Sequence, residues 1–261
     1  MKKLYKKGFS LLLAILLVMS MAACGEKEPV EEPDQKQLAG QTLLIYCGAG
    51  MQKPFEEIAE AFGTETGCEM NVTYGNAAQI QTQIQTSGEG DFFIAGSREE
   101  TKPVAEFVSE NTDLVKHIPV LAVVEGNPKS ISGIADLGRE DVVTVIGDPE
   151  STPIGKIAKK AFSDFGVEVQ PATTTTTAPQ LAAILSVGEA DAAIVWKENC
   201  RAEGVEICET TDLDPYCKTV PAARLTYGLE NEAADVFSEF LASQTAADIW
   251  AKFGYELVNM N

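Results

Sequence analysis

The chain has 261 residues, of which 39 are acidic and 20 are basic, and its net charge at pH 7 is −19. So negative a surface argues against nucleic acid as a partner. The length of the chain allows two lobes with separate cores. With a single histidine and no two cysteines spaced as C-x-x-C, we expect no zinc site and no cofactor.

The first 40 residues have the pattern of an export and anchoring segment. Four lysines within residues 2–7 precede the apolar run LLLAILLV, and the sequence Met-Ala-Ala-Cys that ends at Cys24 is similar to a lipobox. We expect a signal peptide over residues 1–23 and a lipid on Cys24. The charged segment up to residue 40 predicts a flexible tether, so that 24–40 would hold the protein at the outer face of the cell membrane.

Beyond Cys24 the chain has five cysteines, an odd number that requires at least one free thiol or an external partner. Cys200, Cys208 and Cys217 are near enough in sequence for one disulfide, and buried free thiols explain them equally well. Cys47 and Cys68 are expected at opposite ends of neighbouring strands, which disfavours a bridge.

Strand and helix patterns alternate along the first half of the chain. The apolar periodicity predicts strands at 43–47, 68–74 and 90–96, helices that begin at Pro54 and span 76–86 and 98–111, and a long strand at 117–126. Asn76 and Gln79 form a capping-box pattern at the start of the second helix.

The same alternation continues to the end. We expect helices at 131–137, 153–165, 233–242 and 245–253. Strands are expected at 142–146, 190–196 and 205–208, with a long strand at 219–228. The threonine run at 173–177 is expected to be a loop whose last residue caps a helix that begins at Ala178. Such alternation predicts parallel sheets with right-handed crossovers. The two long strands would cross between lobes, which gives lobe I as 41–119 plus 223–261 and lobe II as 120–222.

One turn, GDPESTPIG at 147–155, has the pattern of an anion cradle. Thr152 is a good N-cap and Pro153 a good first helical residue. The amides of Ile154 and Gly155 would then point forward, unbonded, at the positive end of a helix dipole. An ordinary capped turn explains the same residues. Three more turns, at 48–52, 75–78 and 176–178, lie at expected strand ends, where ligands bind in such sheets.

The ordered set of motifs YCGAG, GDFFIAG, ISGIADL, GDPExxPxG, AAIVW and SQTAADIWAKFGYE resembles the molybdate-binding receptors of ABC importers, over residues 41–257. The resemblance implies the type II periplasmic-binding-protein fold: two mixed, mostly parallel sheets flanked by helices, with a ligand cleft between two lobes. It also implies an extracytoplasmic solute-binding lipoprotein that acts as a monomer with a permease and its ATPase. The chain would not be an enzyme, and the nucleophile, phosphate-loop and zinc-protease motifs GxSxG, GxxxxGK[ST] and HExxH do not occur in it.

The resemblance also implies a ligand set for a small tetrahedral oxyanion, molybdate or tungstate. Carried onto this sequence, the family's ligand-binding positions fall on Gly50 with Met51, on Asn76 and Ala77, on Ile154, on Ala178 and on Trp196. The positions of two serines and a tyrosine are occupied by Gly50, Ala77 and Trp196, so all three hydroxyl ligands are absent while the amide positions are kept. Local substitutes would be Gln52, Asn76, Ser151, Thr176, Thr177 and the indole N–H of Trp196.

Three alternatives stay open at this point. In the first, the ligand is another small anion, such as sulfate. In the second, the ligand is a metal cation held near Tyr46, Cys47, Met51 and Glu150. The third alternative is a receptor that passes ligand binding to a sensor kinase.

Overall fold

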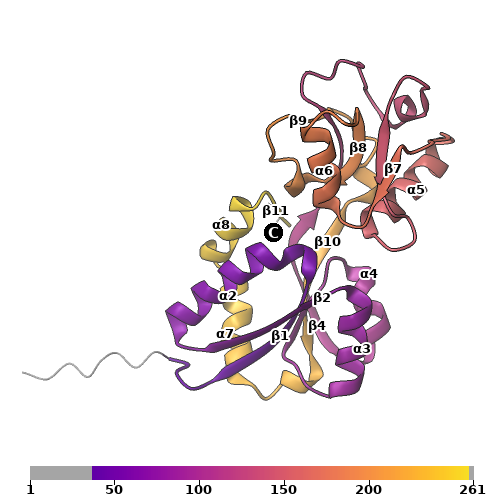
Figure 1. Cartoon of the computed structure of the whole chain (residues 1–261). Coiled ribbons are helices and arrows are strands. Elements are labelled where there is room, and N and C mark those ends of the chain that lie inside the picture. The colour runs from indigo at the N-terminus through magenta and orange to yellow at the C-terminus, as the bar shows by residue number, and fades with distance from the viewer. Residues whose placement is uncertain (1–36, 259–261) are drawn as a thin grey trace, which may run out of the picture. The chain divides into compact units, whose positions relative to one another are not determined.

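A computed structural model describes residues 37–258, which form two β-sheets flanked by helices (Figure 1). The expected α/β fold with two mixed sheets is confirmed. The expected signal peptide, Cys24 and most of the tether lie outside the described residues. Within residues 37–258, no helix is long and apolar enough to cross a membrane.

The first sheet has six strands in the order β11-β4-β10-β3-β1-β2. Its strands are β1 Thr42–Gly48, β2 Glu69–Gly75, β3 Phe92–Ile94, β4 Val108–His117, β10 Lys218–Leu225 and β11 Glu256–Leu257. Strands β1, β2 and β3 are parallel to one another, whereas β10 is antiparallel to β3 and β4. The helices that accompany this sheet are α2 Gln52–Thr66, α3 Ala77–Ser87, α4 Arg98–Thr101, α7 Glu232–Leu241 and α8 Gln244–Lys252.

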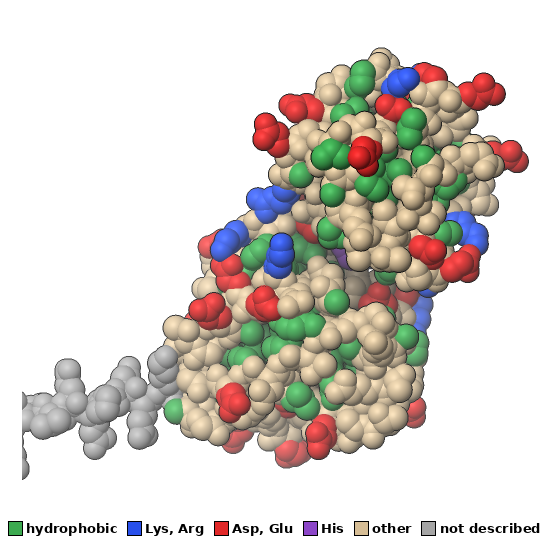
Figure 2. All heavy atoms as spheres, in the orientation of Figure 1, with side chains coloured by type: hydrophobic (Ala, Val, Ile, Leu, Met, Phe, Trp, Pro, Cys, Tyr) green, Lys and Arg blue, Asp and Glu red, His purple; other side chains and the backbone are tan. Residues whose placement is uncertain are grey.

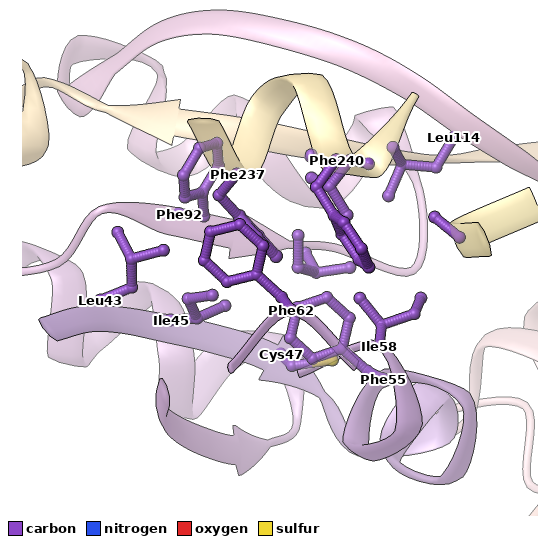
Figure 3. Close-up of a cluster of buried hydrophobic side chains, with 14 of the residues drawn as sticks. Leu43, Ile45, Cys47, Phe55, Ile58, Phe62, Phe92, Leu114, Phe237 and Phe240 are labelled. Carbon is purple, nitrogen blue, oxygen red and sulfur yellow. The ribbon is translucent and has the colours of Figure 1, made fainter. Parts of the chain in front are cut away.

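An aromatic cluster forms the core between this sheet and helices α2 and α7 (Figure 3). The rings of Phe62 and Phe237 meet edge to face with centroids 4.9 Å apart, and Phe240 lies 5.3 Å from Phe62. Edge-to-face packing of buried rings adds stabilisation beyond the burial of their area. This core packs α2 and α7 against the first sheet, and the 3-10 segment Ala49–Met51 separates α2 from β1.

The second sheet has five strands in the order β7-β6-β8-β5-β9. Its strands are β5 Pro119–Val124, β6 Thr144–Gly147, β7 Thr173–Thr175, β8 Ala192–Trp196 and β9 Val205–Ile207. Strands β6, β7 and β8 are parallel, and helices α5 Pro153–Phe165 and α6 Ala178–Ser186 follow β6 and β7. The apolar stripes of both helices, with Ile157 and Leu181 among them, lie in the core of this sheet.

Several expected elements differ from the structure, among them the predicted strand 219–228, which ends at Leu225 and is followed by a 3-10 segment over Thr226–Gly228. The predicted helix 98–111 is divided into α4, which ends at Thr101, and a 3-10 helix over Lys102–Phe107, and the prediction is wrong from Val108, where β4 begins. Pairing with β10, more than 100 residues away in the chain, overrides the local acidic composition there. The predicted long strand 117–126 is split at residue 118, so that β4 ends in the first sheet and β5 begins in the second with Pro119.

The threonine run is also structured differently from the expected loop. Thr173–Thr175 forms the edge strand β7, which pairs in parallel with β6, and Thr177 is the N-cap residue of α6 without a side-chain hydrogen bond. The expected tether extends too far, since Leu38 is buried in the first core and its amide donates to the carbonyl of Thr66 over 2.9 Å. The five cysteines beyond residue 37 are all free thiols.

The exact boundaries of the two lobes, 41–119 plus 223–261 and 120–222, stay a prediction. β10 pairs with β4 from Lys218 onward. This pairing favours a second boundary near Cys217 rather than at residue 222.

Candidate functional site

The parallel strands of the first sheet end together at one edge. Gly48 at the end of β1 is paired with Gly75 at the end of β2, and Cys47 is paired with Ile94 of β3. Each strand is followed by a turn that opens a helix, as expected for the ligand-binding edge of a parallel sheet.

The first turn is a 3-10 segment, Ala49–Met51, that leads into α2. Gly50 is exposed, and a β-carbon added to it would meet no atom within 4 Å. Met51 is 1% exposed, and its Cε atom fills the space beside Gly48. The side chain of Met51 therefore belongs to the core, and only its main chain is left to serve a ligand.

The second turn is closed by the predicted capping box. The side chain of Asn76 accepts from the amide of Gln79 over 3.0 Å, and the side chain of Gln79 accepts from the amide of Asn76. Ala77 and Ala78 are the next two residues, whose amides have no intrahelical acceptor. These two amides, rather than the main-chain amide of Asn76, which donates to Gln79, are the groups free to bind an anion.

The third turn, after β6, is held together by Asp148. Its carboxylate accepts from the amide and hydroxyl of Ser151, each over 2.8 Å, and from the amide of Glu150. These hydrogen bonds hold the pKa of Asp148 below its usual range, and the bond from the Ser151 hydroxyl has the largest effect. The hydroxyl of Ser151 is thus already engaged and is no ready substitute for a lost ligand.

Only one of the two amides expected in this turn is available. The amide of Gly155 donates to the hydroxyl of Thr152 over 3.0 Å, which corrects the expectation that it points forward unbonded. No acceptor is found within the described residues for the amide of Ile154. Glycine at 155 is explained by the close approach of the carbonyl oxygens of Gly147 and Asp148, not by a ligand.

The fourth turn leads from β7 into α6. The hydroxyl of Thr175 donates to the carbonyl of Thr177 over 3.0 Å, while Pro179 is the second residue of the helix and has no amide hydrogen. Ala178, the first helical residue, keeps its amide free of intrahelical partners. β6 and β7 are in parallel register up to Gly147 and Thr175, so the third and fourth turns lie at one edge of the second sheet.

The two edges meet at a residue that the sequence reasoning left out of the site, His117. Its ring stacks on Trp196, with centroids 3.6 Å apart and planes 21° from parallel. Its Nδ1 atom lies 3.2 Å from the carbonyl oxygen of Gly96, and its Nε2 atom lies 3.0 Å from Oε1 of Glu198. Gly96 follows β3 of the first sheet, and Trp196 ends β8 of the second.

Acidic groups surround this junction. The amide of Gly96 donates to Glu100 over 2.9 Å, and burial raises the pKa of the Glu100 carboxyl. Burial, and then the charge of Glu198, raise the pKa of Tyr255. Over the face seen in Figure 2, acidic side chains in red are spread widely. An anion at this site would therefore have to be bound by local dipoles against an unfavourable overall field.

The residues named for a cation do not converge. The hydroxyl of Tyr46 lies 3.2 Å from that of Ser87, and Glu150 is paired with Lys159. The thiol of Cys47 is fully buried. Between residues 37 and 258, no cluster of three or more histidine, cysteine or carboxylate side chains is placed to hold a metal ion.

Two α/β sheets that contact each other beyond the ends of their strands, here through His117 between Gly96 and Trp196, are typical of two-lobed binding proteins. A family model described as bacterial extracellular solute-binding protein matches residues 43–256. The chain therefore belongs to this family, and the resemblance inferred from the motifs is confirmed.

Individual relatives agree with this assignment. A Haemophilus influenzae protein whose name says only that it is a binding protein is 29% identical over 214 residues, which cover 77% of this chain and 86% of that protein. The molybdate-binding protein ModA of Mycobacterium tuberculosis is 24% identical over 189 residues, 71% of this chain and 72% of ModA. In structure, the substrate-binding domain of a Clostridium difficile protein assigned to a molybdenum ABC transporter is similar, with a TM-score of 0.70, 24% identity, and coverage of 84% of this chain and 99% of that domain.

Proposed function

We propose that the chain is the solute receptor of an ABC importer and that its ligand is a small tetrahedral oxyanion, molybdate or tungstate first. The receptor is not an enzyme. It is anchored by a lipid on Cys24, acts as a monomer outside the cell membrane, and delivers its ligand to a permease driven by an ATPase. The names of its relatives support both the transport role and the anion.

The observation that carries the proposal is the set of unbonded amides at helix N-termini. Ala77 and Ala78 of α3, Ile154 of α5 and Ala178 of α6 each open a helix at the ligand-binding edge of a sheet. An anion at such positions gains hydrogen bonds and a favourable dipole at once. The contact of His117 with both Gly96 and Trp196 supports placing these turns around one cleft.

The absence of the family's three hydroxyl ligands at Gly50, Ala77 and Trp196 would weaken the binding of an anion. A hydrogen bond to a charged group contributes about 1.5–3 kcal/mol, so three lost ligands remove roughly 5–9 kcal/mol. Within the described residues, the hydroxyls of Thr176 and Thr177 have no hydrogen-bond partner, and the indole of Trp196 is a further donor. We infer that these groups take over part of the missing contribution, and that the anion is fully deprotonated because the indole only donates.

Titration calorimetry of the full chain in detergent tests the proposal. The ligands to compare are molybdate, tungstate, sulfate, phosphate and a divalent cation such as Zn²⁺. Micromolar or tighter binding of one oxyanion, with little heat from the cation, is the expected result. Heat from the cation alone, with none from any oxyanion, would overturn the proposal.

A further inference from the structure

His117 is held at both ring nitrogens, an arrangement that a merely space-filling side chain does not need. A carbonyl oxygen only accepts, so Nδ1 carries the hydrogen that is donated to Gly96. Nε2 lies 3.0 Å from Oε1 of Glu198, and the hydrogen bond between them needs a second proton, on Nε2 or on the carboxyl, because Nδ1 already carries the first. His117 is 9% exposed, and its imidazole cannot turn without breaking one of these bonds.

The fixed ring matters because of what stacks on it. We propose that His117 is a positioning residue of the anion site, which sets the plane of the Trp196 indole and so aims its N–H at the ligand. This inference rests on the proposed function, in which Trp196 stands where the family has a tyrosine ligand.

The exchange of a tyrosine for a tryptophan explains why positioning is required. A tyrosine hydroxyl rotates about its C–O bond and adapts its hydrogen to the ligand. The indole N–H lies in the ring plane, so its direction changes only when the whole ring turns. Hydrogen bonds weaken steeply when the donor angle falls below about 120°, so a loosely held indole would lose much of its contribution. A ring stacked 3.6 Å away removes that freedom.

The junction also connects the two edges that bear the amides. His117 ends β4 in the first sheet, whereas Trp196 ends β8 in the second, and Glu198 lies two residues later in the 3-10 segment Lys197–Asn199. An indole fixed from the first sheet is therefore oriented relative to the turns that follow β1, β2 and β3. The same contact gives Trp196 a definite position relative to both groups of amides.

A double-mutant cycle with molybdate tests the inference, using the full chain in detergent and the variants His117→Gln, Trp196→Phe and the double variant. Trp196→Phe removes one donor and should weaken molybdate binding about ten- to hundredfold. If His117 acts through the indole, His117→Gln should weaken binding at least several-fold in the parent and hardly at all in the Trp196→Phe background. Equal losses in both backgrounds would overturn the inference while leaving the proposed function intact.

Two further measurements distinguish positioning from a general structural role. The chain has two tryptophans, so ¹⁹F NMR of the ligand-free protein labelled with 5-fluorotryptophan should show two resonances. The resonance that disappears in the Trp196→Phe variant is that of Trp196. His117→Gln should shift that resonance, and an unmoved signal would overturn the stacking on which the inference depends. Because this readout needs no ligand, it separates a failure here from a failure to bind any oxyanion, which would overturn the proposed function and the inference together.

A conservative variant provides the rescue. His117→Phe combined with Glu198→Gln keeps a flat ring under the indole and leaves no buried carboxylate without its partner. It should bind molybdate more tightly than His117→Gln, and equal or weaker binding by a folded protein would contradict the proposal. Tyr227→Phe, which changes the exposed ring stacked on Phe107, is the matched control and should leave the affinity unchanged.

Discussion

A β-carbon at Gly155 would lie 2.3 Å from the carbonyl oxygen of Gly147, far inside van der Waals contact. The clash is with main chain at the end of β6, which cannot move without opening the turn. Gly155→Ala should therefore lower the free energy of unfolding by about 1–3 kcal/mol, although alanine is favoured in helices by about 1 kcal/mol. Urea unfolding measures the difference.

Gly50→Ala is the control for this prediction, since an added β-carbon there meets nothing within 4 Å. Its free energy of unfolding should stay within about 0.5 kcal/mol of the parent. Equal stability of the Gly155→Ala variant and the parent would show that the turn yields more easily than its geometry implies.

Local chemistry explains which elements were predictable. Helix α5 begins at Pro153 and ends at Phe165 as expected, because Thr152 caps its start and Gly166 adopts the left-handed conformation after its end. The capping box of Asn76 and Gln79 was predictable for the same reason. These signals need only neighbours in sequence.

Features set by distant parts of the chain were not predictable. The length of β4 depends on pairing with β10, and the stacking of His117 on Trp196 depends on how the chain passes between the sheets. The engagement of the Gly155 amide by Thr152 was readable in principle, because an N-cap threonine commonly accepts from the third helical residue. A lone histidine just before a predicted crossing was the available signal for the junction.

Removal of single amides should weaken anion binding without disturbing the fold. Ala77 and Ala178 are first helical residues, and the residues before them are extended, with ψ of 159° and 144°. Proline fits such positions, because its fixed φ suits the first helical residue and it tolerates an extended predecessor. Ala77→Pro and Ala178→Pro should each weaken molybdate binding about tenfold or more in calorimetry.

Gln244→Pro is the matched control for these variants. Gln244 is the exposed first residue of α8, and Ser243 before it is extended with ψ of 161°. Unchanged affinity is expected for this variant. Ile154→Pro is a poorer choice, because Ile154 is 1% exposed and the substitution would also remove a core side chain. Parent affinity in both alanine variants would exclude these two amides from the site.

The half-buried carboxyl of Glu100 should make stability depend on pH. Burial raises its pKa above the usual value of 4.5, so the native state keeps a proton that the unfolded chain has lost. Stability from this group is therefore lost as the pH rises from 4.5 through the folded pKa. Glu100→Gln cannot ionise, so it should gain stability relative to the parent over that range, in urea unfolding carried out up to neutral pH.

Glu99→Gln gives the opposite sign in the same segment. Burial acts to raise the pKa of Glu99, but its hydrogen bonds and the charge of Lys218 outweigh this effect and lower it. The parent should therefore lose stability relative to this variant as the pH falls through the folded pKa of Glu99. Parallel profiles for the parent and Glu100→Gln would mean that the carboxyl of Glu100 is solvated in the native state.

Restoring a hydroxyl to the first turn should increase the affinity for molybdate. Gly50 occupies the position at which the resemblance places a serine, it is exposed, and its surroundings leave room for a side chain. One hydrogen bond to a charged group contributes about 1.5–3 kcal/mol, so Gly50→Ser should bind molybdate about tenfold more tightly or better. Gly50→Ala restricts the backbone in the same way without adding a donor, and it should bind as the parent does. Calorimetry of the three proteins decides the point: if serine and alanine bind molybdate equally, the hydroxyl does not reach the anion, and the first turn contributes at most its main chain.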